Sequence, residues 1–99
     1  MAFEIVYSPE AIDHLLALTK FEQTIVLDQV DEQLIHQPQH STRKRKLLRP
    51  NPIAPWELRI GDLRVFYRVE VTRIEFVTVI AVGKKIGNQL WIGGERIDL

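Results

Sequence analysis

The fold is decided by the stretch Trp56-Glu-Leu-Arg-Ile-Gly-Asp-Leu-Arg-Val-Phe-Tyr-Arg-Val69. Apolar and polar residues alternate on both sides of Gly61-Asp62, as they do in half-buried strands. A two-residue connection with glycine first favours a type II′ turn, which joins two antiparallel strands into a hairpin. This turn predicts a register that pairs Trp56 with Tyr67, Leu58 with Val65, Arg59 with Arg64 and Ile60 with Leu63.

A third strand is expected after the hairpin, over residues 73–82, because this segment becomes apolar on both faces towards its end. Gly83-Lys84-Lys85 is expected to end it. A turn at Val71-Thr72 would place Arg68 opposite Glu75. Alternation then predicts one core face, made of Trp56, Leu58, Ile60, Leu63, Val65, Tyr67, Val69, Ile74, Phe76, Thr78, Ile80 and Val82.

One strand and two helices are expected before the hairpin. Phe3–Tyr7 is β-prone, and Ser8-Pro9 is a good N-cap followed by a good first helical residue. A second helix, with Phe21 in its apolar stripe, starts near Thr19-Lys20 and is stopped by Pro38. The order β-α-α-β-β-β predicts an α+β fold, with two helices packed on one face of an antiparallel sheet. The length favours a single domain over residues 1–99.

The remaining segments are less regular. Residues 38–55 contain four of the five prolines and are expected to form a loop with a strand or turn inside it. The tail contains three glycines, so we expect short strands rather than a helix, at residues 89–92 and 95–99.

Composition excludes several classes of protein. No cysteine is present and the three histidines lack metal-binding spacing, so we expect neither a disulfide nor a metal or other cofactor. No signal peptide or membrane span is recognisable, and a cytoplasmic protein is expected. The net charge is zero, but residues 1–40 hold seven acidic residues and one lysine, whereas residues 41–99 hold six acidic and twelve basic residues. Either the basic half binds an anionic partner or the two halves attract each other.

The second face of the predicted sheet carries charges in place of apolar side chains. Arg59 and Arg64 face each other, which costs stability unless an anion or a neighbouring acid such as Glu57 lies between them. Lys85 shares this face by alternation, and Phe66 is expected to be exposed, either by chance or as a surface for base stacking. Arg68 is expected to pair with Glu75, although it is also a candidate for binding RNA.

A basic run adds to this charge. It is either a solvated loop or a track for phosphates, and its cations are Arg43, Lys44, Arg45, Lys46 and Arg49. Lys84 is a further candidate for RNA binding, or else part of a polar strand end.

The sequence resembles the RelE/ParE superfamily of bacterial toxins from about Phe3 to Lys85. The resemblance lies in three places: Lys46-Leu-Leu-Arg-Pro50, the hairpin quoted above, and Val79-Ile-Ala-Val-Gly-Lys-Lys85. It implies the β-α-α-β-β-β fold and the toxin half of a type II toxin–antitoxin pair, with a cognate antitoxin as partner.

The resemblance also implies a function. RNA-cleaving members bind mRNA in the ribosome and use the 2′-hydroxyl of the RNA to cleave its own backbone, without a cofactor. Arg64 matches a residue that contacts the scissile phosphate, and Arg59 and Lys85 match further basic positions. Glu57 is a candidate general base or a partner of Arg59. Trp91 stands where many nucleases have a tyrosine or histidine; indole is no proton donor for catalysis, but it stacks on bases.

Two other readings of the resemblance remain open, a ParE-like toxin that binds DNA gyrase and a non-catalytic member that only binds its antitoxin.

Overall fold

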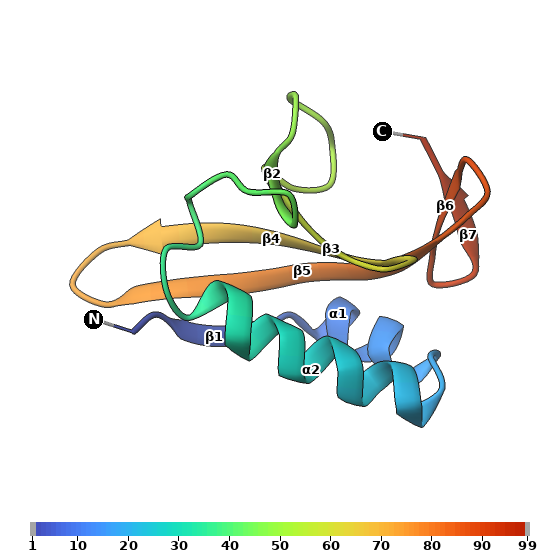
Figure 1. Cartoon of the computed structure of the whole chain (residues 1–99), viewed down its shortest axis with the longest axis horizontal. Coiled ribbons are helices and arrows are strands. Elements are labelled where there is room, and N and C mark those ends of the chain that lie inside the picture. The colour runs from blue at the N-terminus through green and yellow to red at the C-terminus, as the bar shows by residue number, and fades with distance from the viewer. Residues whose placement is uncertain (1, 99) are drawn as a thin grey trace.

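Two helices cover one face of a sheet in the computed structural model, which describes residues 2–98 (Figure 1). The helices are α1 (Pro9–Leu16) and α2 (Lys20–Leu34). The strands are β1 (Glu4–Tyr7), β2 (Arg45–Leu47), β3 (Trp56–Ile60), β4 (Leu63–Val71), β5 (Glu75–Ile86), β6 (Gln89–Ile92) and β7 (Glu95–Ile97). The predicted α+β fold is confirmed.

The sheet runs in the order β2-β3-β4-β5-β6-β7, and β1 pairs with β5 beside this path. All pairs along the path are antiparallel, but β1 and β5 are parallel. The predicted antiparallel sheet is therefore present, and the parallel pairing of β1 was not predicted from the sequence. It arises because α1 and α2 return the chain to the sheet by a crossover, which permits a parallel neighbour.

Both helices begin at the residues that the sequence indicates. The Ser8 hydroxyl accepts a hydrogen bond from the backbone N–H of Ala11 at 3.1 Å, as an N-cap does. Thr19 and Glu22 form a capping box, in which each side chain accepts a hydrogen bond from the other residue's backbone N–H. These caps satisfy backbone donors that would otherwise lack partners at the start of each helix.

The β3–β4 hairpin has the predicted register, with Arg59 opposite Arg64 and Ile60 opposite Leu63. Gly61 has a φ of 56°, as the first position of a type II′ turn requires.

The register of β4 with β5 differs from the prediction. Arg68 pairs with Thr78 in place of Glu75, and the connection is the three residues 72–74 in place of the expected two-residue turn at Val71-Thr72. Ile80 forms a β-bulge, because Phe66 pairs with Ala81 whereas Tyr67 pairs with Val79. The bulge reverses the alternation, so Val77 and Val79 are buried in the main core, where Phe76, Thr78 and Ile80 were expected. Ser8 stabilises the bulge, because its hydroxyl donates a hydrogen bond to the Ile80 carbonyl at 3.0 Å.

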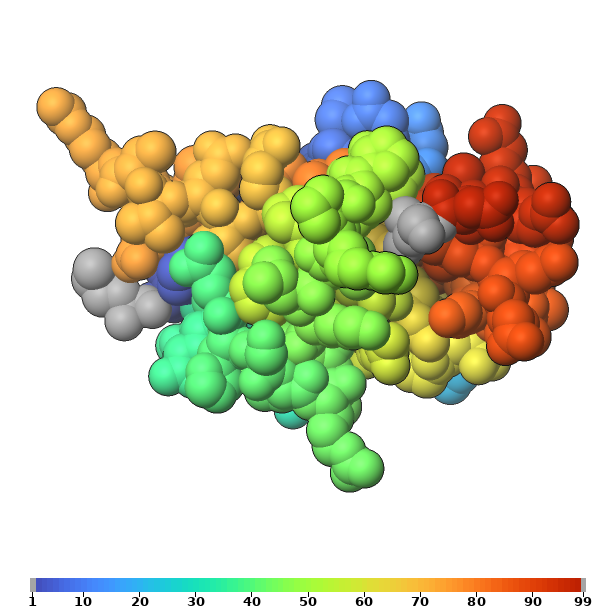
Figure 2. All heavy atoms as spheres, turned by 90° about the horizontal axis from the view of Figure 1, so that it is seen from above, coloured from blue at the N-terminus to red at the C-terminus, as the bar shows by residue number. Residues whose placement is uncertain are grey.

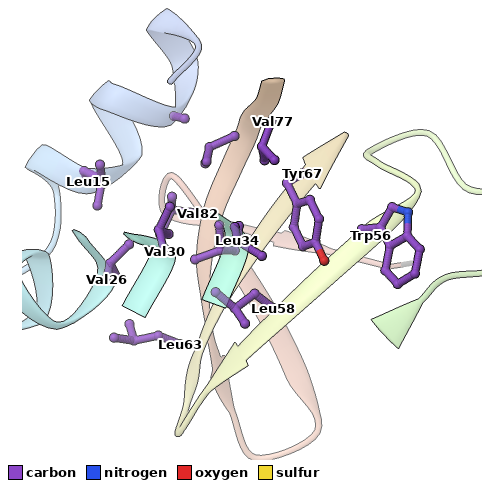
Figure 3. Packing of buried hydrophobic residues seen from close by; sticks show 13 residues of the cluster. Leu15, Val26, Val30, Leu34, Trp56, Leu58, Leu63, Tyr67, Val77 and Val82 are labelled. Carbon is purple, nitrogen blue, oxygen red and sulfur yellow. The ribbon is translucent and has the colours of Figure 1, made fainter. Parts of the chain in front are cut away.

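The main core lies between the helices and the sheet (Figure 3). Val26, Val30 and Leu34 of α2 pack there against strand residues that include Leu58 and Tyr67. The Tyr67 hydroxyl donates a hydrogen bond to the carbonyl of buried Pro38 at 2.7 Å, and burial raises the pKa of this tyrosine. Phe21, expected in the apolar stripe of the second helix, is instead 76% exposed.

A second, smaller apolar cluster lies on the opposite face of the sheet. It contains Phe66, Ala81, Leu90 and Ile92, together with Ala54 from the loop before β3. The β6–β7 hairpin and residues 48–54 therefore pack over part of the face that sequence reasoning left open to solvent.

Candidate functional site: a basic cleft on the second face of the sheet

Glu57 is the centre of the site. It lies in β3, is only 7% exposed, and is placed by the hairpin register beside the facing pair Arg59 and Arg64. Its Oε1 lies 3.0 Å from Arg64 Nε, and its Oε2 lies 3.9 Å from Arg59 Nε. One carboxylate therefore stands between two guanidinium groups. It lies closer to Arg64, whereas the sequence indicated Arg59 as its partner.

The two arginines are held differently. Arg64 Nη1 donates hydrogen bonds to the carbonyls of Gly61 and Leu63 at 2.6 and 2.9 Å, and its side chain is 12% exposed. The turn therefore holds this guanidinium rigidly. The Arg59 side chain is 42% exposed and reaches solvent.

The Nε groups of both arginines are buried beside the Glu57 carboxylate, which is their charged partner at 3.0 and 3.9 Å. A carboxylate so placed offsets part of the cost of burying two like charges.

A cleft of about 450 Å³ lies over these residues. Figure 2 views this face, with the segment around β2 in green near the centre and the β6–β7 hairpin in red beside it. Six cations and two carboxylates line the cleft together with four neutral residues. The lining residues are Lys46, Arg49, Glu57, Arg59, Arg64, Lys85, Asn88, Gln89, Leu90, Arg96, Ile97 and Asp98.

The excess of cations makes the cleft attractive to anions. A concave surface lined by one sign of charge concentrates the field inside it and raises the local concentration of oppositely charged ligands. Arginine matches phosphate oxygens with two parallel donors, whereas lysine offers a compact charge. The cleft is therefore suited to phosphate groups.

Lys46, Arg49 and Lys85 line the cleft together with Glu57 and the arginine pair. The sequence predicted a shared surface for Lys85, Glu57 and the two arginines, but it did not place Lys46 and Arg49 on that surface. Arg43 and Lys44 are exposed but lie outside the cleft.

Arg45 has a structural role that the sequence did not reveal. Its guanidinium donates hydrogen bonds to the Gln33 carbonyl at 2.6 Å and the His40 carbonyl at 3.0 Å, which ties β2 to the end of α2.

Lys84 lies on the face of the sheet that the helices cover, opposite to Lys85. Its Nζ is 2.7 Å from Glu22 Oε2 of α2, and this hydrogen bond holds the pKa of Glu22 below its usual value. The same contact raises the pKa of Lys84. Lys84 therefore lies outside the cleft, because adjacent strand residues point to opposite faces; its candidate role in RNA binding stays a prediction.

Three further candidates also lie away from the cleft. Phe66 is fully buried in the second cluster, so the prediction of an exposed ring for stacking is wrong. Trp91 pairs with Lys84 and so shares its face of the sheet, outside the cleft lining. Arg68 pairs with Glu70 at 2.9 Å, in place of the expected Glu75, and also lies outside the cleft.

Sequence reasoning missed one wall of the cleft, formed by Asn88, Gln89, Arg96 and Asp98. The sequence does contain a signal for a turn here, because Gly87-Asn88 is a two-residue connection with glycine first, like the hairpin turn Gly61-Asp62. It joins β5 to β6, and β5 runs on to Ile86 where we expected it to end near Gly83.

Residues 2–98 contain no group of three or more histidine or acidic side chains arranged to hold a metal ion. No helix in this part of the chain is long and apolar enough to cross a membrane.

Two helices on one face of a mainly antiparallel sheet form the α+β arrangement that the resemblance to the RelE/ParE superfamily implied. Residues 5–85 match the family model described as ParE toxin of type II toxin–antitoxin system, parDE, and the chain belongs to this family. It is therefore the toxin of a type II toxin–antitoxin system, and the family implies an antitoxin as partner. No curated protein matches the chain.

Proposed function

We propose that this toxin inhibits translation as a ribosome-dependent mRNA endoribonuclease, and that the basic cleft is its RNA-binding and cleavage site. The observation that carries the proposal is the cluster of Glu57, Arg59 and Arg64 at the cleft, with Lys46 and Lys85 beside it. A carboxylate next to several cations provides a proton acceptor and charge stabilisation for one phosphate.

The reaction assigns a role to each group. The Glu57 carboxylate accepts the proton of the 2′-hydroxyl, whose oxygen attacks the adjacent phosphorus. Arg59 and Arg64 stabilise the negative charge that develops on the phosphorane oxygens. The bond from phosphorus to the 5′ oxygen breaks, the leaving oxygen takes a proton from the ammonium group of Lys85 or Lys46, and a 2′,3′-cyclic phosphate remains.

In this proposal, the cations outside the cluster of Glu57, Arg59 and Arg64 bind the mRNA that flanks the cleaved phosphate. Arg49 lines the cleft, and exposed Arg43 and Lys44 extend its positive charge along the loop before β2. Such contacts to phosphates raise affinity without reading sequence, and salt weakens them.

Ribosomes programmed with a defined message test the proposal directly. The unmodified toxin should produce new RNA ends within translated codons, mapped by primer extension, and the cleaved RNA should carry cyclic phosphate. Arg59→Ala and Glu57→Gln should slow cleavage by on the order of 100-fold, because each removes a group that acts in the transition state. Arg73→Ala is the matched control, since Arg73 is exposed and lies outside the cleft.

A second candidate function is inhibition of DNA gyrase by binding. One observation favours it: among residues 2–98, no histidine or tyrosine lines the cleft to serve as an efficient proton donor. The name of the matching family points the same way. Induced cells with intact transcripts and broken or unreplicated DNA would establish this function and overturn the nuclease proposal.

A further inference from the structure

The edge of β5 that faces β1 and β6 has a gap between these two strands. β1 pairs with residues 76–79 of β5, and β6 pairs with residues 83–86. Within residues 2–98, no strand pairs with residues 80–82 on this edge. The register of β5 with β6 would bring Gly93 opposite Val82, but Gly93 has a φ of 59° and turns the chain away. Backbone groups in such a gap need other partners.

Helix α1 fills this gap with two side chains. Ser8, its N-cap, donates a hydrogen bond from its hydroxyl to the Ile80 carbonyl at 3.0 Å. His14, in the last turn of the helix, accepts a hydrogen bond on Nδ1 from the backbone N–H of Val82 at 3.3 Å. The imidazole therefore takes the place of the strand partner that Gly93 does not provide.

The same imidazole packs against the turn of the β6–β7 hairpin. A Cβ atom at Gly93 would lie 3.2 Å from His14 Cδ2 and 3.3 Å from His14 Nε2, so a larger residue there would press on the ring. His14 lies three residues after buried Ala11 and is itself half-buried, which places it on the face of α1 that is turned to the sheet. One side chain thus joins α1, β5 and the β6–β7 turn.

The strand that His14 holds leads directly to the cleft. Lys85, which lines the cleft, lies three residues after Val82, roughly 10 Å along β5. On one edge, the Lys85 N–H donates a hydrogen bond to the Asp62 carbonyl in the β3–β4 turn at 2.7 Å. On the other edge, Lys85 pairs with Leu90 of β6, and this pairing begins next to His14. The position of Lys85 therefore depends on how the edge of β5 is completed at Val82.

We infer that His14 is a positioning residue of the cleft. From α1 it completes the edge of β5, and it thereby fixes Lys85 and the start of the β6–β7 hairpin. Val82 is 1% exposed, and a buried N–H that loses its acceptor is unfavourable, so removal of the imidazole loosens this part of the strand. The effect of His14 on cleavage rests on the proposed function, in which Lys85 acts on the phosphate.

Two substitutions of the same shape separate the hydrogen bond from packing. Asparagine carries an acceptor oxygen at the place of the imidazole Nδ1, whereas leucine carries a methyl group there. His14→Asn should therefore keep the hydrogen bond from Val82, and His14→Leu should lose it. His36→Leu is the control, because His36 is exposed and lies outside the cleft.

Nuclear magnetic resonance spectroscopy measures the positioning without RNA. The unmodified protein should show a scalar coupling across the hydrogen bond between Val82 N and His14 Nδ1. His14→Leu should speed hydrogen exchange at Val82 by roughly tenfold, as expected for the loss of one hydrogen bond. It should also shift the backbone signals of residues 83–92 and weaken the binding of inorganic phosphate several-fold, whereas His14→Asn and the control should not. Absence of the coupling, or an unchanged Lys85 signal in His14→Leu, would overturn the inference.

Cleavage of mRNA on programmed ribosomes tests the consequence for function. His14→Leu should cleave roughly tenfold more slowly than the unmodified protein, because a small displacement of an acting group has a large effect on rate. His14→Asn should retain most of the rate. Unchanged cleavage by His14→Leu would overturn the positioning role. Resonance signals that respond as expected, in a protein that leaves mRNA intact, would support the positioning of Lys85 and overturn the proposed nuclease.

Discussion

Replacement of Glu57 by glutamine removes the charge that separates Arg59 from Arg64 while leaving the shape of the side chain nearly unchanged. Glu57 is 7% exposed, and its carboxylate oxygens lie 3.0 and 3.9 Å from the two Nε atoms. Like charges directly across a sheet cost up to about 1 kcal/mol. Loss of one partner from a buried pair costs about 3–5 kcal/mol. Because Arg59 is partly solvated, we expect Glu57→Gln to lower the free energy of unfolding by about 1–3 kcal/mol.

Phosphate should reverse part of this loss. The variant leaves two cations facing each other, so an added anion takes the place of the carboxylate and binds the folded state alone. Binding of a ligand at ten times its Kd stabilises a protein by about 1.4 kcal/mol. We therefore expect phosphate to raise the stability of Glu57→Gln by more than it raises that of the unmodified protein.

Urea denaturation followed by circular dichroism measures both effects, in phosphate and in chloride at equal ionic strength. The control is Glu70→Gln, which breaks the exposed ion pair with Arg68 and should change the free energy of unfolding by less than about 1 kcal/mol. The reasoning is refuted if Glu57→Gln costs no more than this control, or if both proteins respond equally to phosphate.

Three further predictions concern the scaffold. Tyr67→Phe leaves the buried Pro38 carbonyl without its 2.7 Å hydrogen bond and should cost about 1–3 kcal/mol in urea unfolding; a neutral result would contradict the assigned bond. Lys84 lowers the pKa of Glu22, so the charged form of Glu22 stabilises the folded state. The free energy of unfolding of the unmodified protein should therefore exceed that of Glu22→Gln above the ordinary pKa of 4.5, and this difference should vanish as the pH falls through the lowered value. A difference constant with pH would refute this. Gly83→Ala should displace β6, because its Cβ would lie 2.6 Å from a backbone oxygen; unshifted amide resonances in β6 would show that the strand does not pack as described.

Local signals predicted the start of both helices and the β3–β4 hairpin correctly, because each depends on residues close together in the chain. Ser8-Pro9 and Gly61-Asp62 restrict the backbone wherever they occur. The same reasoning placed Arg59 opposite Arg64, since a two-residue turn leaves only one register.

The errors come from features that depend on distant residues. The bulge at Ile80 places Val77 and Val79 in the main core. The pattern of apolar residues in β5 does not by itself indicate this extra residue. Phe66 was expected in solvent because the strands alone leave that face open, but the β6–β7 hairpin and the loop before β3 cover it. The partner of Lys84 likewise lies 62 residues away in α2.

The sequence by itself determined the order of the elements, the hairpin register and the shared surface of Glu57, Arg59, Arg64 and Lys85, because turns and alternation act over a few residues. Only the tertiary structure decided which cations meet in one cleft, which are tied to carbonyls or acids elsewhere, and which residues close its far wall. Those outcomes depend on packing between segments far apart in the chain, where burial and charge pairing override local preference.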